Sequence, residues 1–270
     1  LFSLLRAMYK THPVHIDIAG TVESIAEITP ELLYKCYETF YNFSNMVLCV
    51  AGNVTPDEVL SVADRLLKPQ KPIRIERKFH REPREVAESY TEETLSVAFP
   101  IFSLGFKEAV ETPERSLREI LISDIILEAV AGKTSAFYSE LLEAGLINTS
   151  FESEYFCGYG YAAWIFTGES PDGREVQKRI TARIRALQET GISKADFERI
   201  RKKLYGRSIM QFNDIDGIAN AMVSAYFCKE GLFDETEILQ SLTLDEVNVR
   251  LRTALQTDCA SLSVIKPEGE

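Results

Sequence analysis

Apolar side chains recur every three or four residues through most of the chain, the spacing that places them on one face of a helix. Several of these stretches begin with a capping signature, because Thr29 precedes Pro30 and Thr55 precedes Pro56. The pattern predicts helices over residues 1–10, 30–41, 56–67, 113–131, 135–144, 172–190, 194–210, 214–229 and 244–254.

Short runs of β-branched and aromatic residues, typical of strands, lie between the helical stretches. They cover residues 46–51, 90–106, 148–156, 159–167 and 260–265. Strands and helices are interspersed without the regular alternation of a doubly wound parallel sheet. We therefore expect an α+β fold in which helices cover antiparallel sheets.

The sequence contains one internal repeat. Thr29 begins a helix that leads to an apolar strand around Leu48, and Thr243 begins a helix that leads to a strand around Leu262. Both pairs of positions are 214 residues apart. Two related units, the first of them truncated, would explain this pattern, and chance similarity between two capped helix–strand units explains it equally well.

Residues 69–88 differ in composition from their surroundings. Basic residues alternate there with three prolines, which is typical of an extended, solvated linker. A polyanion-binding arm is the alternative, but four glutamates dilute the positive charge. We therefore predict a linker over 69–88 between one part formed by residues 1–68 and another formed by residues 89–270.

The composition excludes several classes of protein. The chain has 270 residues, of which 45% are hydrophobic, and a formal charge of −11. This apolar content argues against a disordered chain, and no apolar run approaches the ~18 residues of a membrane-spanning helix. The acidic balance argues against nucleic acid and anionic membranes as partners.

Two further features concern the compartment and the start of the chain. Its five cysteines are widely spaced and include no C-x-x-C pair, so we expect reduced thiols and a cytoplasmic location. Leu1 already lies within a helical pattern and no signal peptide follows it, which favours a truncated start.

Two stretches carry the residue types of a ligand site. His12, His15 and Asp17 suggest zinc, but Pro13 argues against a shared helical face, so an ordinary polar loop is favoured. Residues 131–135 end like a phosphate-binding loop, yet the leading glycine of that motif would fall at Leu127, within an apolar helix.

Gly132 as the end of one helix and Thr134 as the cap of the next explain residues 131–135 better than a phosphate-binding loop does. No G-x-S-x-G, H-E-x-x-H or H-x-x-E-H motif occurs in the sequence. The residues by themselves therefore define no catalytic centre.

Further segments follow one another in a specific order. Residues 12–13 read His-Pro, 18–29 contain G-T-x-x-S-I-x-x-I-T, 40–46 read F-Y-x-x-x-N-M, and 50–56 read V-x-G-x-V-x-P. A later stretch over 131–146 runs from Gly-Lys-Thr-Ser to Gly-Leu. Together they resemble the pitrilysin family of zinc peptidases, which includes insulysin and the mitochondrial processing peptidases. The likeness is greatest to short bacterial members that work in pairs.

The resemblance implies two related α+β half-domains, with residues 1–68 as the end of the first and 89–270 as the second. It also implies zinc in the full-length protein, held by an H-x-x-E-H motif and a further Glu. In the family these residues precede the block that begins at His12, so they fall before Leu1. We therefore assign no catalytic residue and no metal ligand to this chain, and we expect it to bind no zinc.

The family also uses an Arg and a Tyr of the second half-domain to stabilise the developing oxyanion. The aligned positions here are Leu142 and Asn148, which cannot replace them. The resemblance therefore implies the zinc-carrying type of subunit, paired with a homologous subunit, in a closed chamber that takes peptides or unfolded polypeptides.

Three hypotheses follow, and whether this chain is itself an enzyme is left open. The first is a C-terminal fragment of a zinc metalloendopeptidase, inactive alone. The second is a non-catalytic scaffold or interaction subunit of the same family. The third is a metal-binding module built on His12, His15 and Asp17.

Overall fold

The computed structural model describes residues 1–268, which separate into two compact units. Unit 1 combines Leu1–Ile18 and Phe79–Lys202 with the chain from Ser241 onward, and unit 2 combines Ala19–Lys78 with Lys203–Gln240. The half-domain boundaries expected from the sequence differ from this division and stay a prediction. No helix in the described part of the chain is long and apolar enough to cross a membrane.

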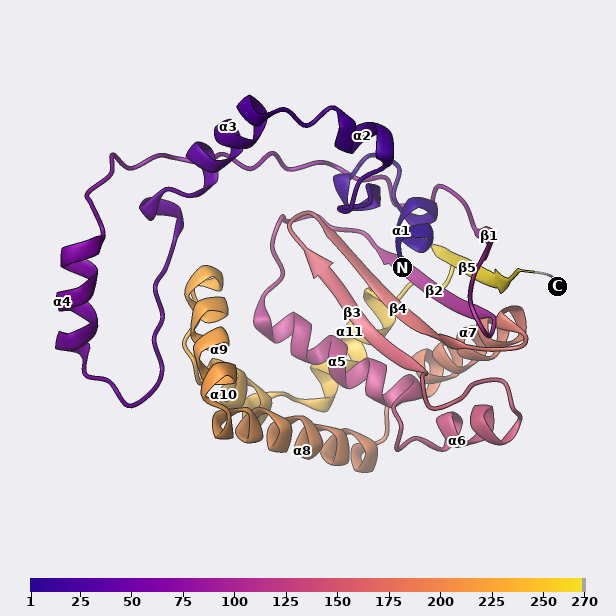
Figure 1. The fold of residues 1–270 in the computed structure, drawn as a ribbon. Helices are drawn as coiled ribbons and strands as arrows, with labels where there is room; N and C mark the ends of the chain where they lie inside the picture. The colour runs from indigo at the N-terminus through magenta and orange to yellow at the C-terminus, as the bar shows by residue number, and fades with distance from the viewer. Residues whose placement is uncertain (269–270) are drawn as a thin grey trace. The chain divides into compact units, whose positions relative to one another are not determined.

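Unit 1 is built on a five-stranded sheet in the order β1-β5-β2-β4-β3 (Figure 1). All neighbours pair antiparallel except β1 and β5, which are parallel. The expected α+β class is therefore confirmed, with one parallel pair that the sequence did not indicate. The strands are β1 (Tyr90–Leu95), β2 (Ile101–Glu108), β3 (Glu152–Gly158), β4 (Tyr161–Glu169) and β5 (Ala260–Pro267).

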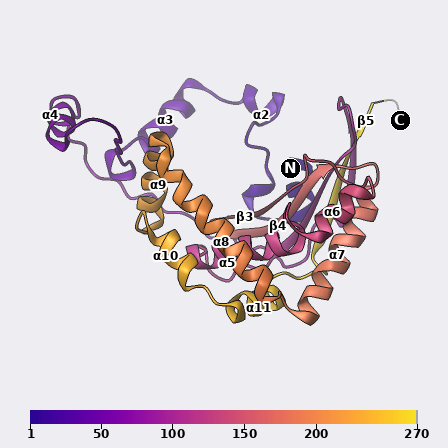
Figure 2. The same cartoon turned by 90° about the horizontal axis from the view of Figure 1, so that it is seen from below.

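Helices cover one face of this sheet (Figure 2). They are α5 (Leu117–Ala131) and α7 (Gly173–Thr190), with α11 (Leu244–Thr253) packed against both. Because side chains alternate along a strand, this face receives every second residue of β2 and β4. The result is a buried core of Phe102, Leu104, Phe106, Trp164 and Phe166.

The opposite face carries small residues along its centre and receives α1 (Phe2–Met8). A Cβ atom at Gly105 would lie 2.3 Å from Met8 Sδ, so the absence of a side chain there allows the close approach. Paired positions nearby hold Ser103 and Ser263. The helix is thereby part of a core cluster formed by Leu4, Leu5, Met8, Tyr9, Ala163 and Ile165.

The second half of the expected linker is attached to unit 1 by a buried ion pair. Lys107 Nζ lies 2.7 Å from Glu82 Oε1, and the two side chains are 2% and 6% exposed. The same ammonium group donates to the carbonyl oxygens of Met8 and Glu85, at 2.9 and 3.1 Å. Residues around Glu82 are therefore fixed between α1 and β2 rather than extended in solvent.

Unit 2 is helical in its described residues. As expected, Thr29 and Thr55 cap two helices by accepting from backbone N–H groups three residues on. The expected strand over 46–51 is wrong, since these residues form no strand. The reason is that a strand needs a neighbour to bond, and unit 2 contains none among its described residues. Its elements are α2 (Val22–Ala26), α3 (Pro30–Phe40), α4 (Pro56–Leu66), α9 (Ile215–Cys228), most of α10 (Asp234–Ser241) and the end of α8 (Lys194–Met210).

Some helix boundaries differ from those expected. Helix α5 begins after Ser116, whose hydroxyl forms a capping box with Glu119, and not at Pro113. Helix α6 (Ala136–Glu143) is capped by Ser135 and not by Thr134. The short helices α2 and α10 were not predicted, whereas α8 has the expected bounds.

Candidate functional site

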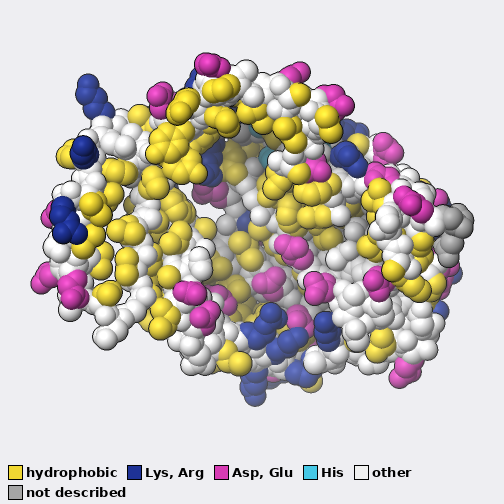
Figure 3. Space-filling model, in the orientation of Figure 1, with side chains coloured by type: hydrophobic (Ala, Val, Ile, Leu, Met, Phe, Trp, Pro, Cys, Tyr) yellow, Lys and Arg dark blue, Asp and Glu magenta, His cyan; other side chains and the backbone are white. Residues whose placement is uncertain are grey.

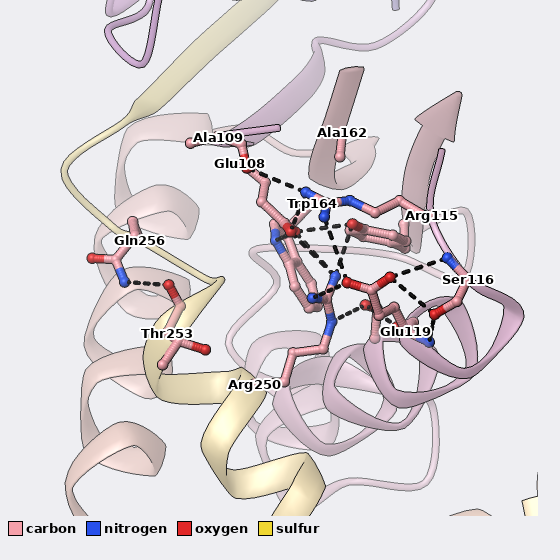
Figure 4. A network of polar contacts seen from close by, with 12 residues as sticks. Glu108, Ala109, Arg115, Ser116, Glu119, Ala162, Trp164, Arg250, Thr253 and Gln256 are labelled. Carbon is pink, nitrogen blue, oxygen red and sulfur yellow. Dashed lines mark hydrogen bonds and ion pairs between the residues drawn. The ribbon is translucent and has the colours of Figure 1, made fainter. Parts of the chain in front are cut away.

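A cluster of charged side chains lies buried at the end of β2 (Figure 4). Glu108 continues the alternation of the core residues of this strand and so faces the apolar side of the sheet. Its carboxylate accepts from the Tyr155 hydroxyl at 2.9 Å and from Trp164 Nε1 at 3.1 Å. Arg115 and Arg250 approach the same carboxylate to 2.8 and 3.2 Å, so it pairs with two guanidinium groups.

The two arginines are held by neighbouring helices. Arg250 of α11 donates from Nε to the Ser123 hydroxyl of α5 and from Nη2 to the Tyr155 hydroxyl, both at 2.8 Å. Its guanidinium carbon lies 5.3 Å from the centre of the Tyr155 ring, within cation–π range. Arg115 lies 3.5 Å from Glu119, the partner of Ser116 in the capping box of α5. Two positive and two negative side chains therefore balance one another.

Burial and hydrogen bonding set the protonation of this network. Burial raises the pKa of Tyr155 well above its usual value, and the nearby Glu108 carboxylate raises it further, so the hydroxyl remains a donor. Burial raises the pKa of Glu119 too, but hydrogen bonds from Ser116 and the nearby guanidinium groups outweigh burial and lower it overall. Neither group changes its charge near neutral pH.

The network borders an open cavity of about 710 Å³ in unit 1. Other residues of its lining include Arg84, Lys107, Glu111, Thr253 and Gln256, the last two visible in Figure 4. The described lining contains no histidine, cysteine or serine that would act as a metal ligand or nucleophile. The arrangement ties β2, β3, α5 and α11 together, which is a structural role.

The sequence analysis did not predict this network. Lys107 and Glu108 directly follow five buried positions of β2, and a charged residue that continues a buried strand needs a partner of opposite charge. This pattern could have indicated a buried ion pair. The partner itself has no local signal, because Glu108 and Arg250 are 142 positions apart.

His12 lies in unit 1, where both of its ring nitrogens are engaged. Nδ1 accepts from the backbone N–H of Val14 at 3.1 Å, so Nε2 carries the proton and donates to the Tyr159 carbonyl at 3.0 Å. His15 Nδ1 bonds in turn to the His12 carbonyl at 2.6 Å. Residues 1–268 contain no group of three or more His, Cys, Asp or Glu that would hold a metal. These contacts do not fit His12 as a zinc ligand.

Because burial lowers the pKa of His12, its neutral form is favoured in the folded state. The His12 side chain therefore binds a proton more readily in the unfolded chain than in the folded one. The contribution of neutral His12 to the free energy of unfolding is complete above the unfolded pKa of about 6.5 and is lost as the pH falls below it. We expect the free energy of unfolding to fall less between pH 7 and pH 5 in His12→Asn than in wild type, measured by urea unfolding. His15→Asn serves as the control, and equal slopes for wild type and His12→Asn would contradict the prediction.

Residues 131–135 connect two helices, as expected. Gly132 ends α5, and its backbone N–H bonds to the Glu128 carbonyl at 3.0 Å. Arg199 donates to the Thr134 hydroxyl, and Lys133 Nζ donates to the Thr149 carbonyl at 3.4 Å. Two helices joined by a short turn are unlike the strand, loop and helix of a phosphate-binding loop.

Leu142 and Asn148, aligned with the Arg and Tyr of the family, lie at and just after the end of α6 in unit 1. Leu142 is 39% exposed and brings no polar atom. Asn148 accepts from the backbone N–H of Ser150 at 2.8 Å and donates to Glu169, so its amide stabilises the local turn. Their place in a substrate chamber stays a prediction.

The described part of the chain thus forms an α+β fold in which no group of three or more His, Cys, Asp or Glu could hold a metal. The family described as "Peptidase M16 inactive domain" matches residues 27–204. The chain belongs to this family of peptidases, which confirms the resemblance to pitrilysin-type enzymes.

Named relatives agree with this assignment. The chain is 33% identical over 274 residues to the "Uncharacterized zinc protease YmfH" of Bacillus subtilis (strain 168), a match that covers 99% of this chain and 64% of the relative. The crystal structure of a putative M16-like peptidase from Alicyclobacillus acidocaldarius is 35% identical, with a TM-score of 0.91, over 99% of this chain and 65% of that one.

A protease from Helicobacter pylori, at 18% identity, shares the fold with a TM-score of 0.81 over 98% of this chain and 66% of that one. The chain therefore spans slightly less than two thirds of the length of these relatives.

Proposed function

We propose that this chain is the C-terminal part of a zinc metalloendopeptidase that degrades or processes peptides in a closed chamber. The observation that carries the proposal is the 33% identity, along 99% of the chain, to a protein named as a zinc protease. Because the chain spans 64% of that relative, the activity belongs to the whole protein.

Zinc is assigned to residues outside this chain. The engaged nitrogens of His12 do not fit the metal, and residues 1–268 offer no other group of three ligands. This chain would instead form a wall of the chamber. Strands β1 and β3 form the two edges of the sheet, where an extended peptide can add as a further strand.

A homologous second subunit completes the active site in this proposal. Leu142 and Asn148 supply neither a guanidinium group nor a phenol, so the donors for the developing negative charge would come from the partner. A cytoplasmic location agrees with the cysteines, since no disulfide stabilises the described residues, and a bacterial origin agrees with the bacterial relatives.

The test compares three samples with equal zinc: the 270-residue chain, the whole protein, and the whole protein mixed with its homologous subunit. Cleavage of an unstructured fluorogenic peptide is measured with and without a chelator. We expect cleavage in the third sample and none in the first. Zinc-dependent hydrolysis by the chain alone would overturn the proposal, and an inactive pair whose upstream sequence lacks H-x-x-E-H would favour the non-catalytic scaffold.

A further inference from the structure

All three histidines of the chain come together in unit 1. His12 and His15 flank the start and end of a short turn, and His80 comes from the segment 79–88. The ring centres of His12 and His80 lie 6.0 Å apart, and His15 Nδ1 lies 2.6 Å from the His12 carbonyl oxygen. Figure 3 shows a small area of histidine on the face drawn, so solvent reaches this cluster. Histidine ordinarily changes its charge between pH 5 and 8, so the cluster can respond to pH in that range.

The hydrogen bonds of His12 require a neutral ring. Nδ1 accepts from the backbone N–H of Val14 at 3.1 Å, which caps the turn, while Nε2 donates to the Tyr159 carbonyl at 3.0 Å. A protonated imidazole carries an N–H on both nitrogens. Protonation would therefore point the Nδ1–H of His12 at the N–H of Val14 and abolish this bond.

The other two histidines keep their contacts when they are protonated. His15 Nδ1 donates to a carbonyl oxygen, which it does equally well with a neutral or a charged ring. His80 is exposed and touches His12 through its ring, and its positive charge opposes a second charge on His12. His12 is therefore the member of the cluster whose protonation breaks a hydrogen bond.

The groups that surround His12 keep their charge between pH 7.5 and 5.5. The rings of Tyr9 and Tyr161 lie 6.2 and 5.1 Å from that of His12, and burial raises the pKa of both phenols, so they stay neutral. Hydrogen bonds lower the pKa of Glu82 to about 2, so it stays ionised, facing the ammonium group of Lys107 at 2.7 Å. A change of charge in this range therefore comes from the histidines.

The segment that begins at Phe79 is attached to His12 at two points. A Cβ atom at Gly160 would lie 3.3 Å from both His12 Nε2 and the Phe79 ring, so the two side chains meet over this glycine. The Phe79 ring also contacts that of Tyr159, edge to face. Further along, the Glu82 carboxylate accepts from the backbone N–H of His12 at 2.7 Å. A rearrangement of His12 therefore acts on both ends of residues 79–82.

These residues lie where the chain passes from one unit to the other. The first stretch of unit 1 ends at Ile18, shortly after His15, and the chain returns to unit 1 at Phe79, directly before His80. The contacts of the cluster thus hold the last residues of unit 1 before the chain leaves it and the first residues after it returns.

We propose that protonation of His12 releases residues 79–82 from the turn at 13–15 and from the β3–β4 turn, so that the cluster is a pH-sensitive latch on the connections between the units. Because burial lowers the pKa of His12, the open form binds the proton more readily, and opening becomes more favourable as the pH falls below the ordinary value of about 6.5. The latch requires neither zinc nor peptidase activity.

Hydrogen exchange of the whole protein at pH 7.5 and pH 5.5 tests the proposal. The backbone N–H groups of Lys10, Thr11 and His12 all donate to Glu82, so their protection reports whether residues 79–82 are attached. After correction for the intrinsic pH dependence of exchange, we expect their protection to fall about 3- to 10-fold, since one proton shifts an equilibrium at most ~10-fold per pH unit. Unchanged protection would overturn the proposal, and so would an equal fall in β2 and β5, which would indicate general unfolding.

His12→Asn and His15→Asn are matched variants. Asparagine does not titrate, and its side-chain oxygen can accept from an N–H two residues on, as His12 Nδ1 does. Protection of residues 10–12 should therefore become independent of pH in His12→Asn and keep its wild-type pH dependence in His15→Asn. A pH dependence that persists in His12→Asn, or that both variants lose, would contradict the role of His12.

A pH series on the wild-type protein keeps the test decisive if His12→Asn lacks protection at every pH. The fall in protection of residues 10–12 should begin between pH 7 and 6, where histidine starts to titrate. A fall confined to values below pH 5 would assign the effect to a carboxylate and overturn the proposal.

Discussion

Replacing Glu108 by glutamine is expected to lower the free energy of unfolding by about 3–5 kcal/mol, the range found when one partner of a buried ion pair is removed. Glu108 accepts from Tyr155 and Trp164 and lies within 3.2 Å of both Arg115 and Arg250. Glutamine carries no negative charge, and the N–H groups of its amide would point at side chains that are themselves hydrogen-bond donors. The effect is measured by urea unfolding followed by circular dichroism.

Glu111→Gln is the matched control for Glu108→Gln, because Glu111 lines the same cavity but is exposed. Its effect should stay within about 0.5 kcal/mol. In the background of Glu108→Gln, Arg250→Met should destabilise the protein less than it does in wild type, because the charge that it removes has already lost its nearest counter-charge and keeps only Glu119, at 3.7 Å. A Glu108→Gln variant as stable as wild type would refute the structural role of the network.

Glu82→Gln is expected to have an effect of similar size, about 3–5 kcal/mol, because it leaves Lys107 buried without its counter-charge. The Glu82 carboxylate accepts from the backbone N–H groups of Lys10 and His12, both at 2.7 Å, and from the N–H and hydroxyl of Thr11 at 2.9 and 2.8 Å. It therefore connects residues 79–88 with the end of α1. Glu85→Gln, at an exposed side chain of the same segment, should be nearly neutral.

The effect of Glu82→Gln should depend on pH. Burial raises the pKa of Glu82, but hydrogen bonds from Lys10, Lys107 and Thr11 outweigh it and lower the pKa from 4.5 to about 2. The stability that the ionised carboxylate provides is therefore complete above about pH 4.5 and is lost as the pH falls toward 2. Urea unfolding is measured at pH 7, 5, 4 and 3. The difference in the free energy of unfolding between wild type and variant should shrink as the pH falls below about 4.5. A constant difference would show that ionisation of Glu82 is not its cause.

The sequence predicted the elements whose signals are local. Thr29, Thr55 and Thr243 cap helices as expected, because a capping hydroxyl acts on backbone groups within three residues. The strand expected at 46–51 is absent from the structure, since pairing depends on a partner strand and not on the residues of one strand. The ion pair of Glu82 with Lys107 spans 25 positions, so no local pattern identified Glu82 as the partner.

The same distinction holds for the site. Motif order was enough to indicate the peptidase family, because a motif is a property of consecutive residues. Only the tertiary structure brought Glu108, Arg115 and Arg250 together, and only it placed Leu33 and Leu48 at the surface while Val247 and Leu262 are buried. The repeated pattern is the same in both copies, and burial differs because it depends on which strands and helices are present to cover each face.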